Sequence, residues 1–258
     1  MKSAELAGIA VFAGVAFLGA PAAIAADEEI QVYMDEIGPP KKLTLDTHVN
    51  NVIDGRGVRD YSGQQISEGR TRITPEFGYA LNGQFELGAY LPLANFSRGG
   101  DLSVDGVKLR LKYVAPRPET QHWYWGANLE VGYVNHSLDP NPWNGELKGI
   151  VGGKWGKWTL AGNLNLDFKV SGPQSAPTEV QIATKAAYAI TEKTSIGIES
   201  YNGLGSLKHL SSLGRNDQQI YAVIDTSFGD WDLNFGVGYG YGDPEDHCTV
   251  KMVIGIPL

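Results

Sequence analysis

Three cations occupy every second position in one stretch of the chain, at Lys108, Arg110 and Lys112. On a β-strand successive side chains point to opposite faces, so these cations share one wall, about 6–7 Å apart. Like charges at that spacing repel unless carboxylates or an anionic solute offset them. Glu86 can reach Lys112, and Glu130 can reach Lys108. We therefore expect Arg110 to be the unpaired charge and the three cations to set an ion or solute preference.

Other charged residues have the same parity on the neighbouring predicted strands. Mixed charge on the inner wall of a barrel can form a wet, selective passage. It can equally form a salt-bridged plug that only stabilises the barrel. We favour the passage, and the candidate pore-lining residues are Arg72, Glu76, Glu86, Lys108, Arg110, Lys112, Glu130 and Lys148.

Motifs for catalysis or for binding metals and cofactors are weak in this chain. The five histidines are scattered, without the spacing typical of metal ligands. His136 and Ser137 are adjacent, so on a strand they point to opposite faces and pair as base and nucleophile only if the chain bends there. The sequence therefore predicts no catalytic residue, no metal site and no cofactor, and a lipid hydrolase is a remote alternative.

The elements that must position these charges are alternating strands, and residues 71–91 are the clearest example. Apolar residues recur there with a period of two, which is typical of strands with one apolar face. The apolar positions are odd-numbered on both sides of Asn82–Gly83, so the loop between them must hold an odd number of residues. We predict a three-residue loop, 81–83, with Gly83 in a left-handed conformation at a bulge. The apolar residues are Ile73, Phe77, Tyr79 and Leu81, then Phe85, Leu87, Ala89 and Leu91.

Two turns reverse this parity. Gly156–Lys157 and Gly229–Asp230 have the glycine-first pattern of two-residue type II′ hairpins, and the apolar positions change between odd and even at each. The alternation continues to the C-terminus over about twelve strands, with short and long connections in turn. The sequence thus predicts an all-β transmembrane antiparallel β-barrel of about 12 strands, with short periplasmic turns and longer extracellular loops.

Aromatic residues on the apolar parity gather beside the connections. Two such girdles are typical of a membrane barrel, whereas a soluble sandwich or ligand-binding barrel with its apolar face inward is the alternative. Beside the short turns lie Tyr79, Phe85, Tyr113, Trp123, Trp125, Trp155, Trp158, Tyr188, Phe228 and Trp231, and toward the other ends lie Tyr133, Phe168, Tyr239 and Tyr241.

The N-terminus and the overall charge indicate the compartment. Residues 1–25 have the form of a signal peptide, with Lys2 before an apolar run and a small-residue cleavage site at Ala23–Ala25. Residues 26–42 are predicted as an N-terminal periplasmic segment, either a free tail or a segment tucked into the barrel mouth, and residues 43–258 as an outer-membrane barrel. The net charge of −8 argues against nucleic acid as a partner. The expected partners are outer-membrane lipid and small solutes in the lumen.

Several stretches resemble a group of proteobacterial outer-membrane proteins. They are Glu29–Tyr33 with Thr44–Val49, Leu109–Pro118, Trp123–Gly126 and Ile254–Leu258. The group is related to the transporter family named for the MetA pathway of phenol degradation. The resemblance implies a barrel that acts as a passive channel or transporter, and it brings no catalytic residue. A non-conducting structural or surface-interaction barrel is the alternative.

Overall fold

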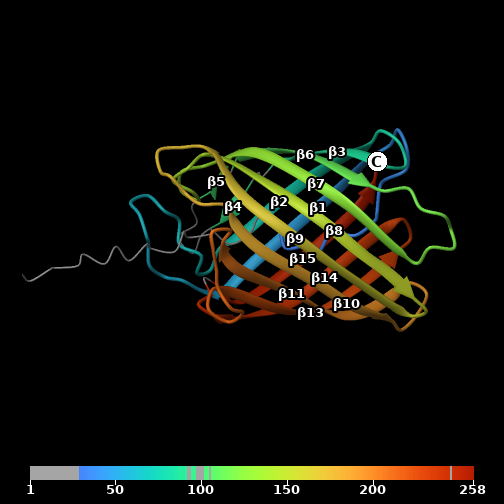
Figure 1. The fold of residues 1–258 in the computed structure, drawn as a ribbon. Coiled ribbons are helices and arrows are strands. Elements are labelled where there is room, and N and C mark those ends of the chain that lie inside the picture. The colour runs from blue at the N-terminus through green and yellow to red at the C-terminus, as the bar shows by residue number, and fades with distance from the viewer. Residues whose placement is uncertain (1–28, 92–93, 97–101, 105, 245) are drawn as a thin grey trace, which may run out of the picture.

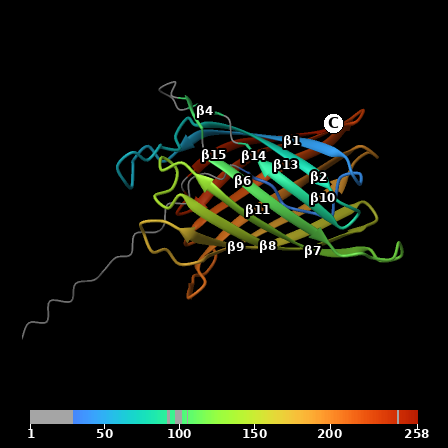
Figure 2. The same ribbon diagram turned by 90° about the horizontal axis from the view of Figure 1, so that it is seen from above.

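The computed structural model describes residues 29–91, 94–96, 102–104, 106–244 and 246–258. They form a closed antiparallel β-barrel of twelve long strands, in which β1 pairs with both β2 and β15 (Figures 1 and 2). The barrel strands are β1 (Leu43–Gly55), β2 (Thr71–Ala80), β3 (Phe85–Tyr90), β6 (Gly106–Val114), β7 (Trp123–Val134), β8 (Trp143–Trp155), β9 (Trp158–Ser171), β10 (Glu179–Ala189), β11 (Thr194–Ser206), β13 (Asp217–Phe228), β14 (Trp231–Gly242) and β15 (Asp246–Pro257).

Three short strands lengthen parts of this ring. β4 (Ala94–Phe96) pairs with β2 and with β5 (Leu102–Ser103), and β12 (His209–Leu210) pairs with β11. β4 and β5 keep the register of β3 and β6. No helix among the described residues is long and apolar enough to span a bilayer. The closed ring of antiparallel strands confirms the all-β barrel of about 12 strands that the alternation predicts.

Both ends of the barrel sequence lie at the end with the short turns. β1 begins there and β15 ends there, and the N–H of Leu258 donates to the carbonyl of Leu43 over 3.0 Å. We call this the short-turn end, and the opposite end, with the connections 56–70 and 207–216, the long-loop end (Figure 1).

The two-residue turns have the predicted register. Trp155 pairs with Trp158 around Gly156, whose φ is 59°, and Phe228 pairs with Trp231 around Gly229, whose φ is 64°. A positive φ at the first central residue is what the type II′ turn requires, and glycine adopts it without steric cost.

The loop of the first hairpin has three residues, as predicted, but it begins one residue later in the chain than predicted. Leu81 donates its N–H to the carbonyl of Phe85 over 2.9 Å, so the loop is 82–84, and Gly83 is not among the residues with positive φ. The prediction for Gly83 was wrong because the Asn82 side chain closes the loop instead. Its Oδ1 accepts the N–H groups of Gln84 and Phe85 at 2.8 and 3.0 Å.

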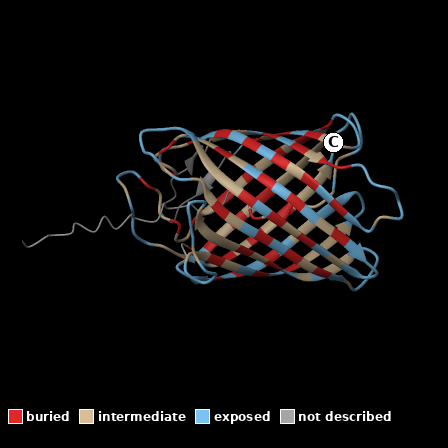
Figure 3. Ribbon diagram, viewed as in Figure 1, coloured by how far each residue is buried: buried red, intermediate tan, exposed pale blue. Residues whose placement is uncertain are grey.

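Buried and exposed residues alternate along the strands (Figure 3). The exposed set is rich in large apolar residues and the buried set in polar and charged ones, so the outer face is apolar and the lumen polar. Leu111 on β6 and Leu129 on β7 are 41% and 43% exposed, whereas the residues directly before them, Arg110 and Asn128, are buried. Most aromatic residues of the expected girdles are exposed on the outer face. Phe85, Tyr113 and Phe168 are half-buried, and Phe168 also lines a cavity.

Candidate functional site: a lumen filled by the N-terminal segment

Residues 29–42, which we call the lumen segment, run inside the barrel without regular secondary structure. Ile30, Val32 and Tyr33 are only 5%, 2% and 3% exposed. The segment leaves the lumen at the short-turn end, where the N–H of Lys41 donates to the carbonyl of Ala80 over 2.7 Å. Two alternatives were open for residues 26–42, a free tail and a segment tucked into the barrel mouth. The described part agrees with the second, and it reaches deeper into the lumen than the mouth.

The backbone of Tyr33 is held by one asparagine of the wall. Asn163 of β9 accepts the N–H of Tyr33 at 2.7 Å and donates its amide to the carbonyl of Tyr33 at 2.9 Å. Asn163 is 2% exposed, so this pair of hydrogen bonds is shielded from water. The geometry mimics one step of a β-ladder and fixes the segment at this depth.

Charged side chains hold the backbone at three further points. Each satisfies a polar group of an extended chain that has no strand partner, as a buried backbone requires. The contacts are Lys251 to the carbonyl of Ile30 at 3.0 Å, Lys112 to the carbonyl of Glu36 at 2.7 Å, and Glu86 to the N–H of Gly38 at 2.9 Å.

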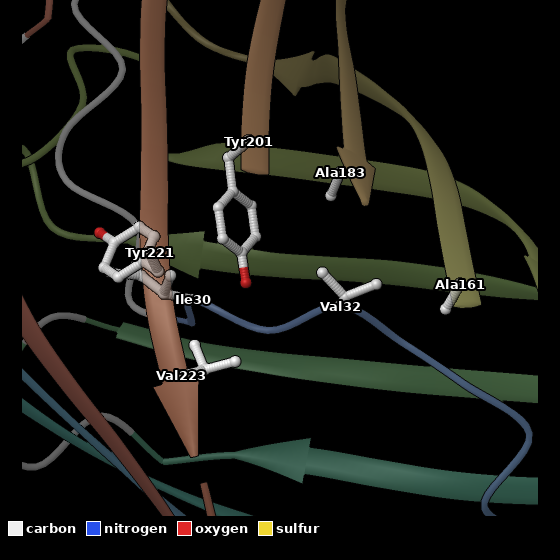
Figure 4. Close-up of a cluster of buried hydrophobic side chains, with 7 residues drawn as sticks. All are labelled: Ile30, Val32, Ala161, Ala183, Tyr201, Tyr221 and Val223. Atoms are coloured by element: carbon white, nitrogen blue, oxygen red, sulfur yellow. The ribbon is translucent and has the colours of Figure 1, made fainter. Parts of the chain in front are cut away.

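One wall of the lumen is apolar where the segment crosses it. Ile30 and Val32 pack there against side chains of β9, β10, β11 and β13 (Figure 4). Burying Ile and Val side chains stabilises this arrangement by roughly 1.5–3 kcal/mol each. The wall residues are Ala161, Ala183, Tyr201, Tyr221 and Val223.

The side chain of Tyr33 lies at the centre of the charged wall. The ammonium of Lys148 is 3.9 Å from the centroid of its ring, which is a cation–π contact. Its hydroxyl contacts the hydroxyl of Tyr90 and lies 3.3 Å from Oε1 of Glu130. Tyr33 therefore joins the segment to three elements of the wall by one side chain.

Arg110 is not unpaired, which corrects the expectation from strand order. Its guanidinium lies 2.6 Å from Glu76 and 2.8 Å from Glu86. Gly88 is the strand neighbour of Arg110 on β3, and a Cβ there would lie 2.5 Å from Nε of Arg110. Because Gly88 has no side chain, the guanidinium crosses β3 and reaches Glu76 on β2.

The eight predicted pore-lining residues all lie on the lumen face. Besides the Arg110 cluster, Lys108 lies 4.0 Å from Glu130, and Lys148 lies 3.0 Å from Glu146. Arg72 is buried and lines a cavity at the long-loop end. The charges are thus mostly partnered with one another or with the lumen segment.

A second ion-pair cluster lies across the lumen and was not among the candidates. Lys185 contacts Glu199 at 3.1 Å and Asp225 at 2.8 Å, and Lys251 contacts Glu199. These residues have the inward parity of their strands, which the sequence shows. Their convergence from β10, β11, β13 and β15 depends on the barrel register, which the sequence does not show.

Two cavities lie on either side of the lumen segment. The one at the short-turn end has about 840 Å³ and the one at the long-loop end about 180 Å³. Gln31 lines both of them. The segment thus lines both cavities, the smaller one with Glu29 and Gln31 and the larger one with most of residues 31–39.

The adjacent His136 and Ser137 do not form a base–nucleophile pair. The His136 ring packs edge-on against Tyr61, with centroids 5.3 Å apart. Within the described residues, the Ser137 hydroxyl has no hydrogen-bond partner.

No protein-family model and no characterised protein matches the sequence. Solved structures do match the fold. The COG4313 outer membrane channel from Pseudomonas putida F1 is 13% identical, with 89% of this chain and 100% of that chain covered and a TM-score of 0.61. The KdgM porin is 10% identical (83% and 99% covered, TM-score 0.54), and the NanC porin is 10% identical (82% and 97% covered, TM-score 0.51). The fold is that of outer-membrane barrels. At this level of identity the similarity describes architecture alone.

Proposed function

We propose that this protein is an outer-membrane channel for small solutes whose resting state is closed by its own lumen segment. The observation that carries the proposal is that residues 29–38 run through a polar lumen and line a cavity toward each of its ends. The outward apolar face, the aromatic residues at its rims and the likeness to porins support the membrane location. Kinship with the family named for the MetA pathway is part of the same proposal.

The segment is built so that it can leave the lumen without damage to the barrel. It contributes no strand to the ring, since β1 and β15 pair directly with each other. Its contacts are side chain to backbone hydrogen bonds and a small apolar cluster. Release would free Asn163, Lys112 and Lys251 to contact a solute at the same depth.

The test is conductance in planar bilayers. We expect the mature chain to conduct weakly and a variant that lacks residues 26–37 to conduct several-fold more, because the two cavities then join. A shift in gel mobility on boiling, measured for both proteins, shows that each barrel is folded. Equal conductance of the two folded proteins contradicts closure by the segment.

The non-conducting alternative has one observation in its favour. Ion pairs of Arg110 with Glu76 and Glu86 span part of the lumen wall independently of the segment. If the truncated barrel is folded and still does not conduct, these pairs close the lumen, and the protein is a structural or surface-interaction barrel.

A further inference from the structure

Three side chains that can bind metals meet in the lumen, each from a different element. They are Glu29 of the lumen segment, His48 of β1 and Glu76 of β2, and one ligand atom of each lies within 4.8 Å of the other two. His48 is fully buried and Glu76 is 3% exposed. The register that pairs Asp46 with Glu76 places His48 and Glu76 on the same inward face.

One buried atom of this cluster, Oε1 of Glu29, has no hydrogen-bond partner. Buried polar atoms almost always have a partner in native proteins, so this oxygen needs an explanation. Nε2 of His48 faces Glu76, so it is the imidazole nitrogen on the side of the cluster. After loss of its proton, Nε2 can donate a lone pair to a cation together with the carboxylate oxygens of Glu29 and Glu76.

Glu76 can serve such a cation and keep its ion pair. Its Oε1 contacts Arg110 at 2.6 Å, whereas its Oε2 lies 3.1 Å from Nε2 of His48. The two oxygens therefore face different partners. Arg110 would orient the carboxylate through its contact with Oε1, because residues that hydrogen-bond to metal ligands commonly fix the orientation of those ligands.

We propose that Glu29, His48 and Glu76 form a binding site for a divalent transition-metal ion of the Zn²⁺ class. The imidazole favours such an ion over Ca²⁺ or Mg²⁺, which prefer oxygen ligands. Three protein ligands leave room for water at the remaining position. Ligand–metal distances of about 2.0–2.2 Å require these side chains to rotate slightly inward.

The cations whose charges act most strongly on the carboxylates of this cluster, Arg110 and Lys148, each have contacts of their own. Arg110 is held by Glu76 and Glu86, and Lys148 lies against Glu146 and the Tyr33 ring. Since Glu29 belongs to the lumen segment and the other two ligands to the wall, a bound ion would tie the segment to the barrel. That this tie would keep the channel closed rests on the function proposed above, but metal binding does not.

The direct test is calorimetric titration of the tag-free mature chain with Zn²⁺, after treatment with a chelator. The variant is Glu29→Gln, which removes one ligand from a segment that pairs with no strand of the barrel. The control is Glu36→Gln, the same change on the same segment, at a residue whose backbone carbonyl accepts the hydrogen bond from Lys112. We expect one saturable site per chain, weakened at least about tenfold by Glu29→Gln and unchanged by Glu36→Gln.

Hydrogen exchange of residues 30–34 gives a second readout that does not depend on conductance. Zn²⁺ should slow exchange there in the wild-type chain and in Glu36→Gln, but not in Glu29→Gln. Absence of saturable binding, or equal binding by Glu29→Gln, overturns the site. A full-length chain that binds Zn²⁺ in a barrel that never conducts refutes only the proposed function. A full-length chain that binds no Zn²⁺, although removal of residues 26–37 raises the conductance, refutes only the metal site.

Discussion

Arg110 illustrates how much a single side chain depends on its neighbours in a barrel. An unpaired charge was expected because strand order assigns Glu86 to Lys112 and Glu130 to Lys108, and the neighbour of Arg110 on β3 is Gly88. The same glycine lets its guanidinium cross one strand and bind two carboxylates at 2.6 and 2.8 Å. Arg110 therefore acts as a structural ion pair, and its effect on selectivity is expected to be secondary.

Replacement of Arg110 should destabilise the barrel strongly. In Arg110→Gln, Glu76 and Glu86 stay buried without their cation, which costs about 3–5 kcal/mol of the free energy of unfolding. The control is Lys169→Gln, which breaks a partly exposed pair with Asp139 and should cost about 0–1 kcal/mol. Denaturant unfolding in lipid measures both. Equal costs for the two variants would mean that the Arg110 pairs contribute no more than a surface contact.

Leu129 tests which face meets the lipid. It is 43% exposed in the middle of β7, so Leu129→Arg should cost about 2–4 kcal/mol of the free energy of unfolding from lipid, because the charge meets hydrocarbon. The same change at Val58, in a long loop, should stay within about 0.5 kcal/mol. If Leu129→Arg lowers the free energy of unfolding no more than the change at Val58 does, the outer face of β7 is in water.

At the scale of elements, the lumen segment is the part that carries the proposed function. It has the composition of a poor strand, with Gly38, Pro39 and Pro40 before β1. Because prolines lack an N–H, this stretch cannot extend the sheet, and the chain turns back into the lumen instead. Asn163 and three charged residues then provide the hydrogen bonds that a neighbouring strand would otherwise supply.

Asn163 is the residue whose loss should loosen the segment. Asn163→Ala removes two hydrogen bonds to Tyr33, each worth about 0.5–1.5 kcal/mol, so hydrogen exchange at residues 31–34 should accelerate roughly 10- to 100-fold. Asn165→Ala is the matched control, since Asn165 lies on the same strand and face but donates to Gln181. If both variants exchange at the wild-type rate, the asparagine does not hold the segment.

At the scale of the whole molecule, closure of the sheet is what makes a membrane location possible. Pairing of β1 with both β2 and β15 leaves no edge strand, so the backbone groups of the ring are satisfied within the barrel. The apolar face is on the outside, where a soluble barrel would have to be polar. The inverted alternative, with the apolar face inward, is excluded by this arrangement.

The location itself can be measured by fractionation. We expect the protein in outer-membrane fractions, resistant to extraction by carbonate, and with different gel mobility before and after boiling. Each result follows from a closed barrel with an apolar belt. Recovery in the soluble periplasmic fraction would contradict the membrane location, while the fold itself would stand.

The sequence by itself determined the barrel and its faces. Period-two alternation decides which side of each strand a residue occupies, and the parity change at Gly156 and Gly229 ties that alternation to turn geometry. These are local properties, set by the backbone within a few residues. For the same reason, the inward position of all eight charged candidates could be predicted.

Only the tertiary structure decided what those charges contact. The partners of Arg110, the convergence of Lys185, Glu199 and Lys251, and the meeting of Glu29 with His48 all join residues far apart in the chain. They depend on the strand register and on the path of residues 29–42 through the lumen. That path is set by the sum of many contacts across the barrel, and no local pattern in the sequence records it.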